Sequence, residues 1–169
     1  MVEVRERQGM HVRVATPRDA PDVRRVADAA WHDAHASIIG AAAVEEFLAE
    51  YYAVEDLRAR YRGGDSTTFV AEADGEVVGY ATGFPGDDAY DLGSIYVHPE
   101  RQDEGVGSRL LEAVETQARE EGYDAIRLVV MADNDAARGF YEAHGFEHAA
   151  DDYDPDLDVQ NCIYEKSLH

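Results

Sequence analysis

The sequence predicts a single mixed α/β domain over residues 1–169, because short β-rich runs alternate with longer segments of helical periodicity. A chain of 169 residues can bury one sizeable core and is too short for two ordinary domains. The dipeptide Asp74-Gly75 separates two β-rich runs, which is a hairpin signal. The expected order is β, α, α, β, β, β, α, β, α, β, with one further strand near Phe146.

The first half begins with "VRVA" at 12–15, which alternates like a short strand. "TPRDA" then indicates a helix start, with Thr16 as the cap, Pro17 at the first helical position and Asp19 reaching back. The other elements expected before residue 98 are the continuation of this helix to Gly40, one or two helices over 44–62, and strands in "TTFVAEA", "EVVGYATGF" and 92–97.

The second half alternates helices and strands. The spacing predicts a helix over 108–121 and another over 135–144, closed by Gly145. "AIRLVV" at 125–130 is mostly apolar and predicts a strand buried on both faces, and "NCIYEKSL" predicts the last strand. "DDYDPDLD" at 151–158 alternates acids like a calcium loop but lacks the required glycine and glutamate, so it is interpreted as a solvated hairpin loop.

The charge of the chain is extreme, with 36 acidic against 15 basic residues and a formal net charge of -21. Such a chain repels nucleic acid, anionic membranes and acidic proteins, so none of these is expected as a partner. Lys166 is the only lysine, and this acidic, lysine-poor composition resembles that of proteins from salt-in halophiles. Concentrated salt would screen the self-repulsion to a Debye length of about 3 Å at 1 M.

The composition also bears on the compartment. No run of about 18 apolar residues exists, and "MVEVRERQGM" lacks the apolar core of a signal peptide. The single cysteine, Cys162, excludes an internal disulfide and a zinc cluster built on cysteines. We therefore expect a cytoplasmic protein without a metal.

The segment "HPERQDEGVGS" joins a strand to a helix through two glycines, Gly105 and Gly107. A helix start offers free N–H groups and the positive end of the dipole, and glycines let a phosphate approach them. The alternative is a tight turn without a ligand. The segment lacks the Gly-Lys-Ser/Thr ending of a P-loop and the third glycine of a dinucleotide-binding fingerprint.

A second motif, "NDAARGFYEAHGF" at 134–146, narrows the interpretation. Together the two motifs resemble the GNAT superfamily of N-acetyltransferases, which carries Gln/Arg-x-x-Gly-x-Gly/Ala after its fourth strand and Asn-x-x-Ala-x-x-Phe-Tyr-x-x-x-Gly-Phe in its last helix. The resemblance covers residues 68–168 well. It implies a mixed, mostly antiparallel central sheet flanked by helices and splayed at strands 4 and 5. The matching residues are Gln102, Gly105, Gly107, Asn134, Ala137, Phe140, Tyr141, Gly145 and Phe146.

The resemblance implies an acetyl-CoA-dependent N-acetyltransferase that moves an acetyl group to a primary amine by direct attack in a ternary complex. The acceptor would be a small-molecule or peptide amine, and a homodimer is left open. Two other hypotheses are a catalytically silent acyl-CoA-binding sensor on the same fold and a salt-adapted scaffold without a ligand. Turnover of an amine would separate the enzyme from both.

The resemblance also implies where acetyl-CoA binds, as a co-substrate. The pyrophosphate would lie on the amides of 102–108, and the pantetheine arm would pair like an extra strand with 95–97. Asn134 would contact the pantetheine. The family usually has glycine and a basic residue where this chain has Asp103 and Glu104. The expected cofactor-binding residues are Ile95, Tyr96, Val97, Gln102, Asp103, Glu104, Gly105, Val106, Gly107, Ser108, Asn134 and Tyr141.

Two catalytic residues are expected. A phenol of pKa about 10 is a suitable acid for a leaving thiolate, and we assign this role to Tyr141, with simple packing beside Phe140 as the alternative. Asp91 stands where histone-type relatives carry a glutamate base, although it could be a solvated acid. The other candidates for the base are His32, His35 or a chain of waters. Trp31 and the tyrosines at 51, 52 and 61 line an acceptor pocket or fill the core.

Overall fold

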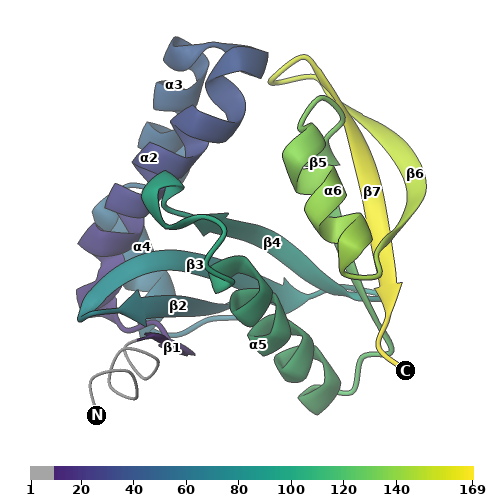
Figure 1. Ribbon diagram of the computed structural model, residues 1–169, viewed down its shortest axis with the longest axis horizontal. Coiled ribbons are helices and arrows are strands. Elements are labelled where there is room, and N and C mark those ends of the chain that lie inside the picture. The colour runs from purple at the N-terminus through teal and green to yellow at the C-terminus, as the bar shows by residue number, and fades with distance from the viewer. Residues whose placement is uncertain (1–9) are drawn as a thin grey trace.

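The computed structural model describes residues 10–169. Residues 1–10, in which the sequence shows no signal peptide, therefore lie outside the described residues except for Met10. In the described part, no helix has the length and apolar character needed to cross a membrane. The elements, shown in Figure 1, are β1 (Met10–Val14), η1 (Pro17–Asp19), α2 (Ala20–Ile39), α3 (Ala41–Tyr51), α4 (Val54–Arg62), β2 (Thr67–Ala73), β3 (Glu76–Pro85), β4 (Tyr90–Val97), η2 (Pro99–Arg101), α5 (Val106–Glu120), β5 (Ala125–Met131), α6 (Asp135–Ala143), β6 (Glu147–Asp154) and β7 (Val159–Ser167).

The strands form one seven-stranded sheet in the order β1-β2-β3-β4-β5-β7-β6. Every neighbouring pair is antiparallel except β4 and β5, which are parallel. Those two strands pair only from Tyr90↔Ile126 to Leu92↔Leu128 and then diverge, so β5, β6 and β7 rise away from β1–β4 in Figure 1. The expected mixed, mostly antiparallel sheet with splayed strands 4 and 5 is confirmed.

Two hydrophobic cores cover the two faces of the sheet. In Figure 1, α5 lies over one face of β2–β4, and α2, α3 and α4 lie on the other side. The core under α5 continues beneath α6, because Leu110 and Val114 of α5 belong to the same buried cluster as Tyr141. The core under α2–α4 contains Trp31, Leu48 and Tyr80. The cleft between β4 and β5 is therefore flanked by packed elements on both sides.

Several element boundaries differ from the sequence-based expectations. The region 44–62 contains two helices, α3 and α4, in agreement with the expected one or two, but α3 begins earlier, at Ala41. Residues 151–154 belong to β6 rather than to a loop. The prediction that β5 is buried on both faces is wrong, because Val129 is 56% exposed and Arg127 pairs with Glu165 at 2.8 Å. One face of β5 has no helix over it, and its apolar residues reflect strand propensity as well as burial.

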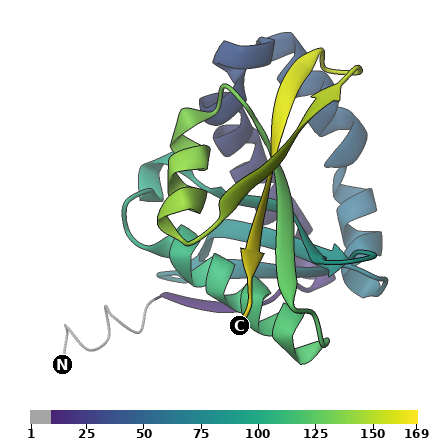
Figure 2. The same cartoon turned by 90° about the vertical axis from the view of Figure 1, so that its right-hand side faces the viewer.

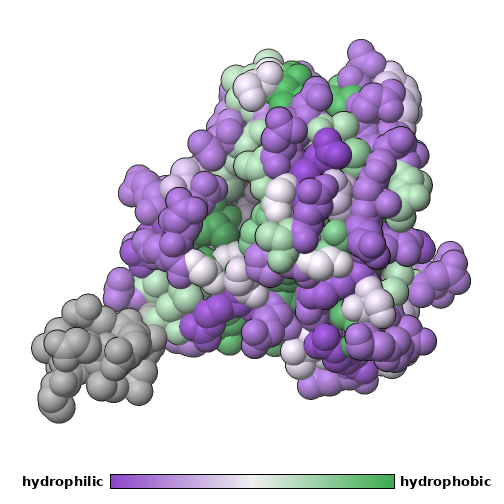
Figure 3. Space-filling view, turned by 45° about the vertical axis from the view of Figure 1, so that its right-hand side comes forward, coloured by the Kyte–Doolittle hydropathy of each residue, from purple (hydrophilic) through white to green (hydrophobic). Residues whose placement is uncertain are grey.

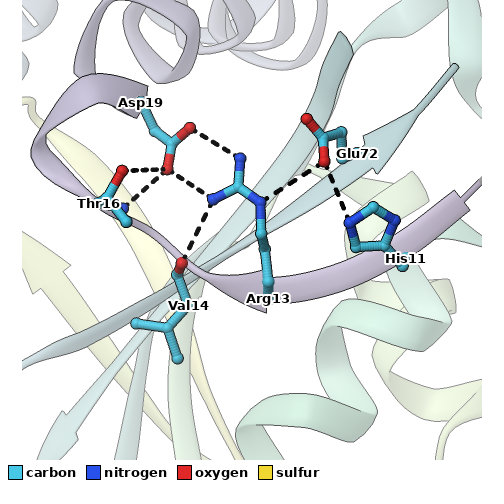
Figure 4. A network of polar contacts seen from close by, with 6 residues as sticks. All are labelled: His11, Arg13, Val14, Thr16, Asp19 and Glu72. Atoms are coloured by element: carbon cyan, nitrogen blue, oxygen red, sulfur yellow. Dashed lines mark hydrogen bonds and ion pairs between the residues drawn. The ribbon is translucent and has the colours of Figure 1, made fainter. Parts of the chain in front are cut away.

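A polar network around Asp19 stabilises the turn that leads into α2 (Figure 4). Its carboxylate accepts two hydrogen bonds from the Arg13 guanidinium, at 2.8 and 3.0 Å, and one from the Thr16 backbone N–H at 2.8 Å. Asp19 is 6% exposed, and the hydrogen bonds from Arg13 are the largest cause of its lowered pKa. The network ties β1 to the start of α2 and confirms the expected turn at Thr16–Asp19.

We expect Asp19→Asn to lower the free energy of unfolding by about 1–3 kcal/mol. Breaking a buried ion pair costs more, but the Arg13 side chain is 34% exposed, so water compensates in part. Because the pKa of Asp19 is lowered by folding, its contribution is present above the unfolded pKa near 4 and is lost as pH falls through the folded pKa. Thermal unfolding between neutral and acidic pH would measure this.

The matched control is Asp28→Asn, which breaks a more exposed ion pair, between Arg24 and Asp28 at 3.0 Å, whose side chains are 29% and 50% exposed. That change should cost no more than about 0.5 kcal/mol. Equal losses of unfolding free energy in the two variants would show that the network around Asp19 stabilises the protein no more than an ordinary ion pair does.

Candidate active site

The edge of β4 facing β5 is open beyond the last paired residues. A bulge leaves Gly93 unpaired, since Gly83 pairs with Leu92 and Thr82 with Ser94. The His98 N–H donates to the Val78 carbonyl on β3 at 2.8 Å. Because successive amides of a strand point to opposite sides, the N–H groups of residues 95 and 97 point to the side that β5 has left. This open edge can pair with an extended chain that carries amide groups.

The glycine loop ends where α5 begins. Gly105 has φ 82° and immediately precedes the helix, whose first turn leaves its backbone N–H groups without helical partners. Asp103 also has a positive φ, 68°, which a glycine would adopt without strain. Glu104 does not line the cavity, and its carboxylate lies 3.8 Å from the Arg101 guanidinium. The loop thus presents backbone donors, and one of its two acids faces elsewhere.

A cavity of about 670 Å³ connects the open edge of β4 with this loop, a volume usual for small-molecule sites. It contains every expected cofactor-binding residue except Glu104. The lining residues are Ala30, Asp33, Ala34, Ser37 and Ile38 from α2; Ile95, Tyr96 and Val97 from β4; Arg101–Asp103, Gly105, Val106, Gly107 and Ser108 around the loop; and Asp133–Ala137, Phe140, Tyr141 and His144 around α6.

Asn134, just before α6, and Tyr141, within it, are among the residues of the second motif that line the cavity. The Asn134 side chain accepts a hydrogen bond from the Ala137 N–H at 3.1 Å and so caps the helix, which leaves its amide nitrogen for the cavity. Tyr141 is 8% exposed, and its hydroxyl makes no hydrogen bond to another described residue between 10 and 169. Burial raises the pKa of Tyr141, so the phenol stays protonated.

The structure adds a contact that the motifs did not reveal, between α5 and α6. The Ser108 hydroxyl lies 2.8 Å from Nε2 of His144, whose Nδ1 lies 2.7 Å from the Phe140 carbonyl oxygen. The Nδ1 proton therefore points to that carbonyl, and Nε2 accepts from Ser108 when the imidazole is neutral. The contact joins the glycine loop to the helix that carries Tyr141. Its only sequence signal was the position of His144 three residues after Tyr141.

The wall on the α2 side is polar at its rim and aromatic behind. Asp33 and Ser37 stand one turn apart on α2 and line the cavity. Behind them His35 is 3% exposed, and its Nε2 lies 3.0 Å from the hydroxyl of Tyr96. Burial lowers the pKa of His35 to about 4, so the ring is neutral at neutral pH. Trp31 packs against His35 with tilted rings, whose centroids are 4.4 Å apart, and belongs to the core.

The structure does not bring Asp91 into the cavity. Its carboxylate lies against Gly86 in the turn between β3 and β4, at the opposite end of β4 from residues 95–97. Burial raises its pKa, while the nearby Arg127 acts in the opposite direction. His32 is also absent from the lining. The role of Asp91 as a base remains a prediction that this geometry does not support.

Comparison with known proteins identifies relatives of this arrangement. A model of the acetyltransferase (GNAT) family matches residues 24–146. The PaiA N-acetyltransferase from Thermoplasma acidophilum, solved in complex with coenzyme A, is 24% identical and superposes with a TM-score of 0.84 over 94% of this chain and 98% of that one. A putative acetyltransferase of the GNAT family from Desulfovibrio desulfuricans is 25% identical, with a TM-score of 0.68 over 95% and 99% of the two chains. The ribosomal-protein-S18-alanine N-acetyltransferase from Escherichia coli is 22% identical, with a TM-score of 0.71 over 94% of each chain.

Proposed function

The chain belongs to the acetyltransferase (GNAT) family, and we propose that it transfers the acetyl group of acetyl-CoA to a primary amine by direct attack in a ternary complex. One observation carries the proposal. A single cavity contains a helix start with free amides, an open strand edge and the buried phenol of Tyr141. These are the groups needed to hold a diphosphate, an amide-bearing arm and a leaving thiolate.

The cofactor would lie along the cavity from α5 to the open edge of β4. The amides of 102–108 would bind the pyrophosphate, because the start of α5 combines unpaired donors with the positive end of its dipole. The pantetheine amides would pair with the backbone of Ile95 and Val97, as an added strand does. Asn134 lines the same cavity, and its amide nitrogen would donate to the pantetheine.

At the thioester, the proposed reaction requires the protein to stabilise an oxyanion and to protonate the leaving thiolate. The N–H of Val97 on the open edge would stabilise the developing oxyanion. Tyr141 would give its proton to the thiolate as the carbon–sulfur bond breaks. Its raised pKa means that the phenol still carries this proton when the reaction begins. A protonated amine must first lose a proton, and the geometry favours water in the cavity over Asp91 for this step.

The acceptor would enter beside α2. Asp33 and Ser37 line that side of the cavity, and the neutral His35 fixes the Tyr96 hydroxyl behind them. The acceptor would be the amine of a small molecule or a peptide. Nucleic acid is an unsuitable acceptor because the chain carries a net charge of -21.

The loop assignment predicts that Gly105→Val abolishes acetyl-CoA binding without unfolding the protein. A β-branched residue at φ 82° is strained by about 1–3 kcal/mol and fills the space above the amides. Calorimetric titration with acetyl-CoA and with a CoA analogue lacking the pyrophosphate would measure the loss.

Gly122→Val is the matched control, because Gly122 follows the other end of α5 with φ 89° and equally open space. It should cost similar stability and leave acetyl-CoA affinity unchanged. If Gly105→Val binds as tightly as Gly122→Val, the loop is only a turn.

The proposed reaction predicts turnover of acetyl-CoA with members of an amine panel, and a loss of about 10²–10⁴-fold in kcat for Tyr141→Phe. The ring would keep its packing, so the KM for acetyl-CoA should change little, which marks an interaction made mainly in the transition state. Assays at saturating substrates with single-turnover kinetics would isolate the chemical step.

Tyr90→Phe is the control, since Tyr90 is fully buried with an unpaired hydroxyl and lies outside the cavity lining. It should acetylate at the rate of the parent. Tight acetyl-CoA binding without turnover of any amine would favour the silent sensor. Undiminished chemistry in Tyr141→Phe would mean that water protonates the thiolate.

The acidic loop predicts that acetyl-CoA affinity rises with salt. Asp103 lines the cavity beside the proposed pyrophosphate, so its repulsion should weaken as KCl screens it. Asp103→Gly should tighten binding roughly fivefold at low salt and flatten the salt dependence, since a nearby like charge costs about 1 kcal/mol. Glu104→Gln, outside the cavity lining, should change the salt slope less.

Affinity should be compared only where circular dichroism shows a folded chain. An unchanged slope in Asp103→Gly would show that this acid does not act on the ligand. The similar proteins give no support for a halophilic source, so this prediction rests on the charges alone.

A further inference from the structure

Three side chains with metal-binding chemistry meet on the β6–β7 arm. They are His148 and Asp151 of β6 and Cys162 of β7, and one candidate ligand atom from each lies within 4.8 Å of the others. The two strands lie side by side at the edge of the sheet in Figure 2. None of the three residues lines the cavity described above. The proposed acetyl transfer gives this cluster no role.

A β-bulge creates the cluster. Residues three apart on a regular strand point to opposite faces, which would separate His148 from Asp151. In β6 the register shifts between His148 and Ala150, so one extra residue brings both side chains to the same face. Asp151 is directly paired with Cys162 across the strands, and Nε2 of His148 lies 2.8 Å from Oδ1 of Asp151.

The burial of the three groups suits a site that is open on one side. Cys162 is 4% exposed and forms the floor, whereas the side chains of His148 and Asp151 are 43% and 72% exposed. The two exposed side chains can rotate to bring their ligand atoms to the Zn–N and Zn–O distances of about 2.0–2.2 Å above a sulfur at about 2.3 Å. Arg138, the nearby cation, is engaged by the Ala132 carbonyl and the Tyr164 hydroxyl.

We propose that His148, Asp151 and Cys162 bind a divalent cation of the zinc class, with water as the fourth ligand. A thiolate and an imidazole favour zinc over magnesium or calcium, which prefer oxygen ligands. The thiol gives its proton to solvent on binding, and thiolate, carboxylate and Zn²⁺ then sum to zero charge. Counting cysteines in the sequence misses such a site, because a mixed site needs only one.

The consequence of binding is a second tie between the edge strand β6 and the rest of the sheet. Seven of the eight residues of β6 are exposed, so hydrogen bonds to β7 carry most of its attachment. A metal bridge from β6 to the buried Cys162 would hold it further. Because a metal that binds only the folded chain stabilises it, the melting temperature should rise with zinc concentration.

Cobalt(II) is the probe that reports the sulfur ligand directly. Titration of the full chain should show one equivalent bound, with the near-ultraviolet band of thiolate-to-cobalt charge transfer and visible d–d bands of tetrahedral type, and zinc should displace the cobalt. Cys162→Ser should lose the charge-transfer band. His148→Ala and Asp151→Asn, both at exposed positions that leave the core intact, should each weaken binding at least about tenfold.

The chain offers a matched control in His169→Ala. Nε2 of His169 lies 2.9 Å from Oδ1 of Asp124, the same pairing as His148–Asp151 but at the far end of β7 from the only cysteine. This variant should bind cobalt like the parent. The proposal is overturned if reduced parent protein shows no charge-transfer band, which would reveal only diffuse binding to surface acids. It is equally overturned if His169→Ala weakens binding as much as His148→Ala.

Discussion

The divergence of β4 from β5 beyond the Leu92–Leu128 pair is the feature on which the rest of the site depends. A strand inside a sheet normally has both edges paired, and an unpaired interior edge leaves backbone donors and acceptors without partners. The bulge at Gly93 rotates the end of β4 at the point where pairing stops. The fold therefore keeps a row of backbone groups for an occupant other than its own chain.

The other parts of the site are placed by packing around this opening. The core under α5 fixes the start of that helix next to the end of β4, and the same core holds Tyr141 across the gap. On the other face, Trp31, His35 and Tyr96 pack as an aromatic group that closes the cavity behind α2. Rigid elements on both sides thus set the distance between the loop, the open edge and the phenol.

The net charge of the chain opposes the proposed anionic ligand, whereas the backbone N–H groups of the loop and the Arg101 side chain, which also lines the cavity, attract it. Figure 3 shows a face covered mostly by hydrophilic residues, and the chain carries a net charge of -21. Acetyl-CoA, itself an anion, can still bind if the backbone amide dipoles that contact it attract it more strongly than the distant, salt-screened acidic side chains repel it. The outward position of Glu104 and its pairing with Arg101 reduce the conflict, whereas Asp103 retains it.

The sequence predicted the parts of the fold whose local signals agree with their tertiary setting. The Asp74-Gly75 hairpin, the turn at Thr16–Asp19 and the two motif helices are examples, since each depends on neighbouring residues. The sequence-based predictions were wrong where packing between distant segments determines the exposure or position of a residue. The exposure of Val129 depends on which face of β5 lacks a helix, and the position of Asp91 depends on how the β3–β4 turn folds over it.

The same distinction applies to the functional residues. The family resemblance assigned Gly105 and Tyr141 to the site from motifs that each lie within one loop or one helix, and both residues line the cavity. The Ser108–His144 contact joins two elements that are distant in the sequence, so no local pattern predicts it. The His148–Asp151–Cys162 cluster requires a bulge, and no residue pattern in β6 predicts that bulge. Periodicity alone would have placed His148 and Asp151 on opposite faces.

Hydrogen–deuterium exchange with and without acetyl-CoA tests the central claim most directly. If the open edge of β4 receives the pantetheine arm, saturating acetyl-CoA will slow exchange at the amides of Ile95 and Val97 and at those of 105–108. The amide of Val12 in β1, at the opposite edge of the sheet, will serve as the unaffected reference. Full occupancy by acetyl-CoA with unchanged exchange at Ile95 and Val97 would contradict the account.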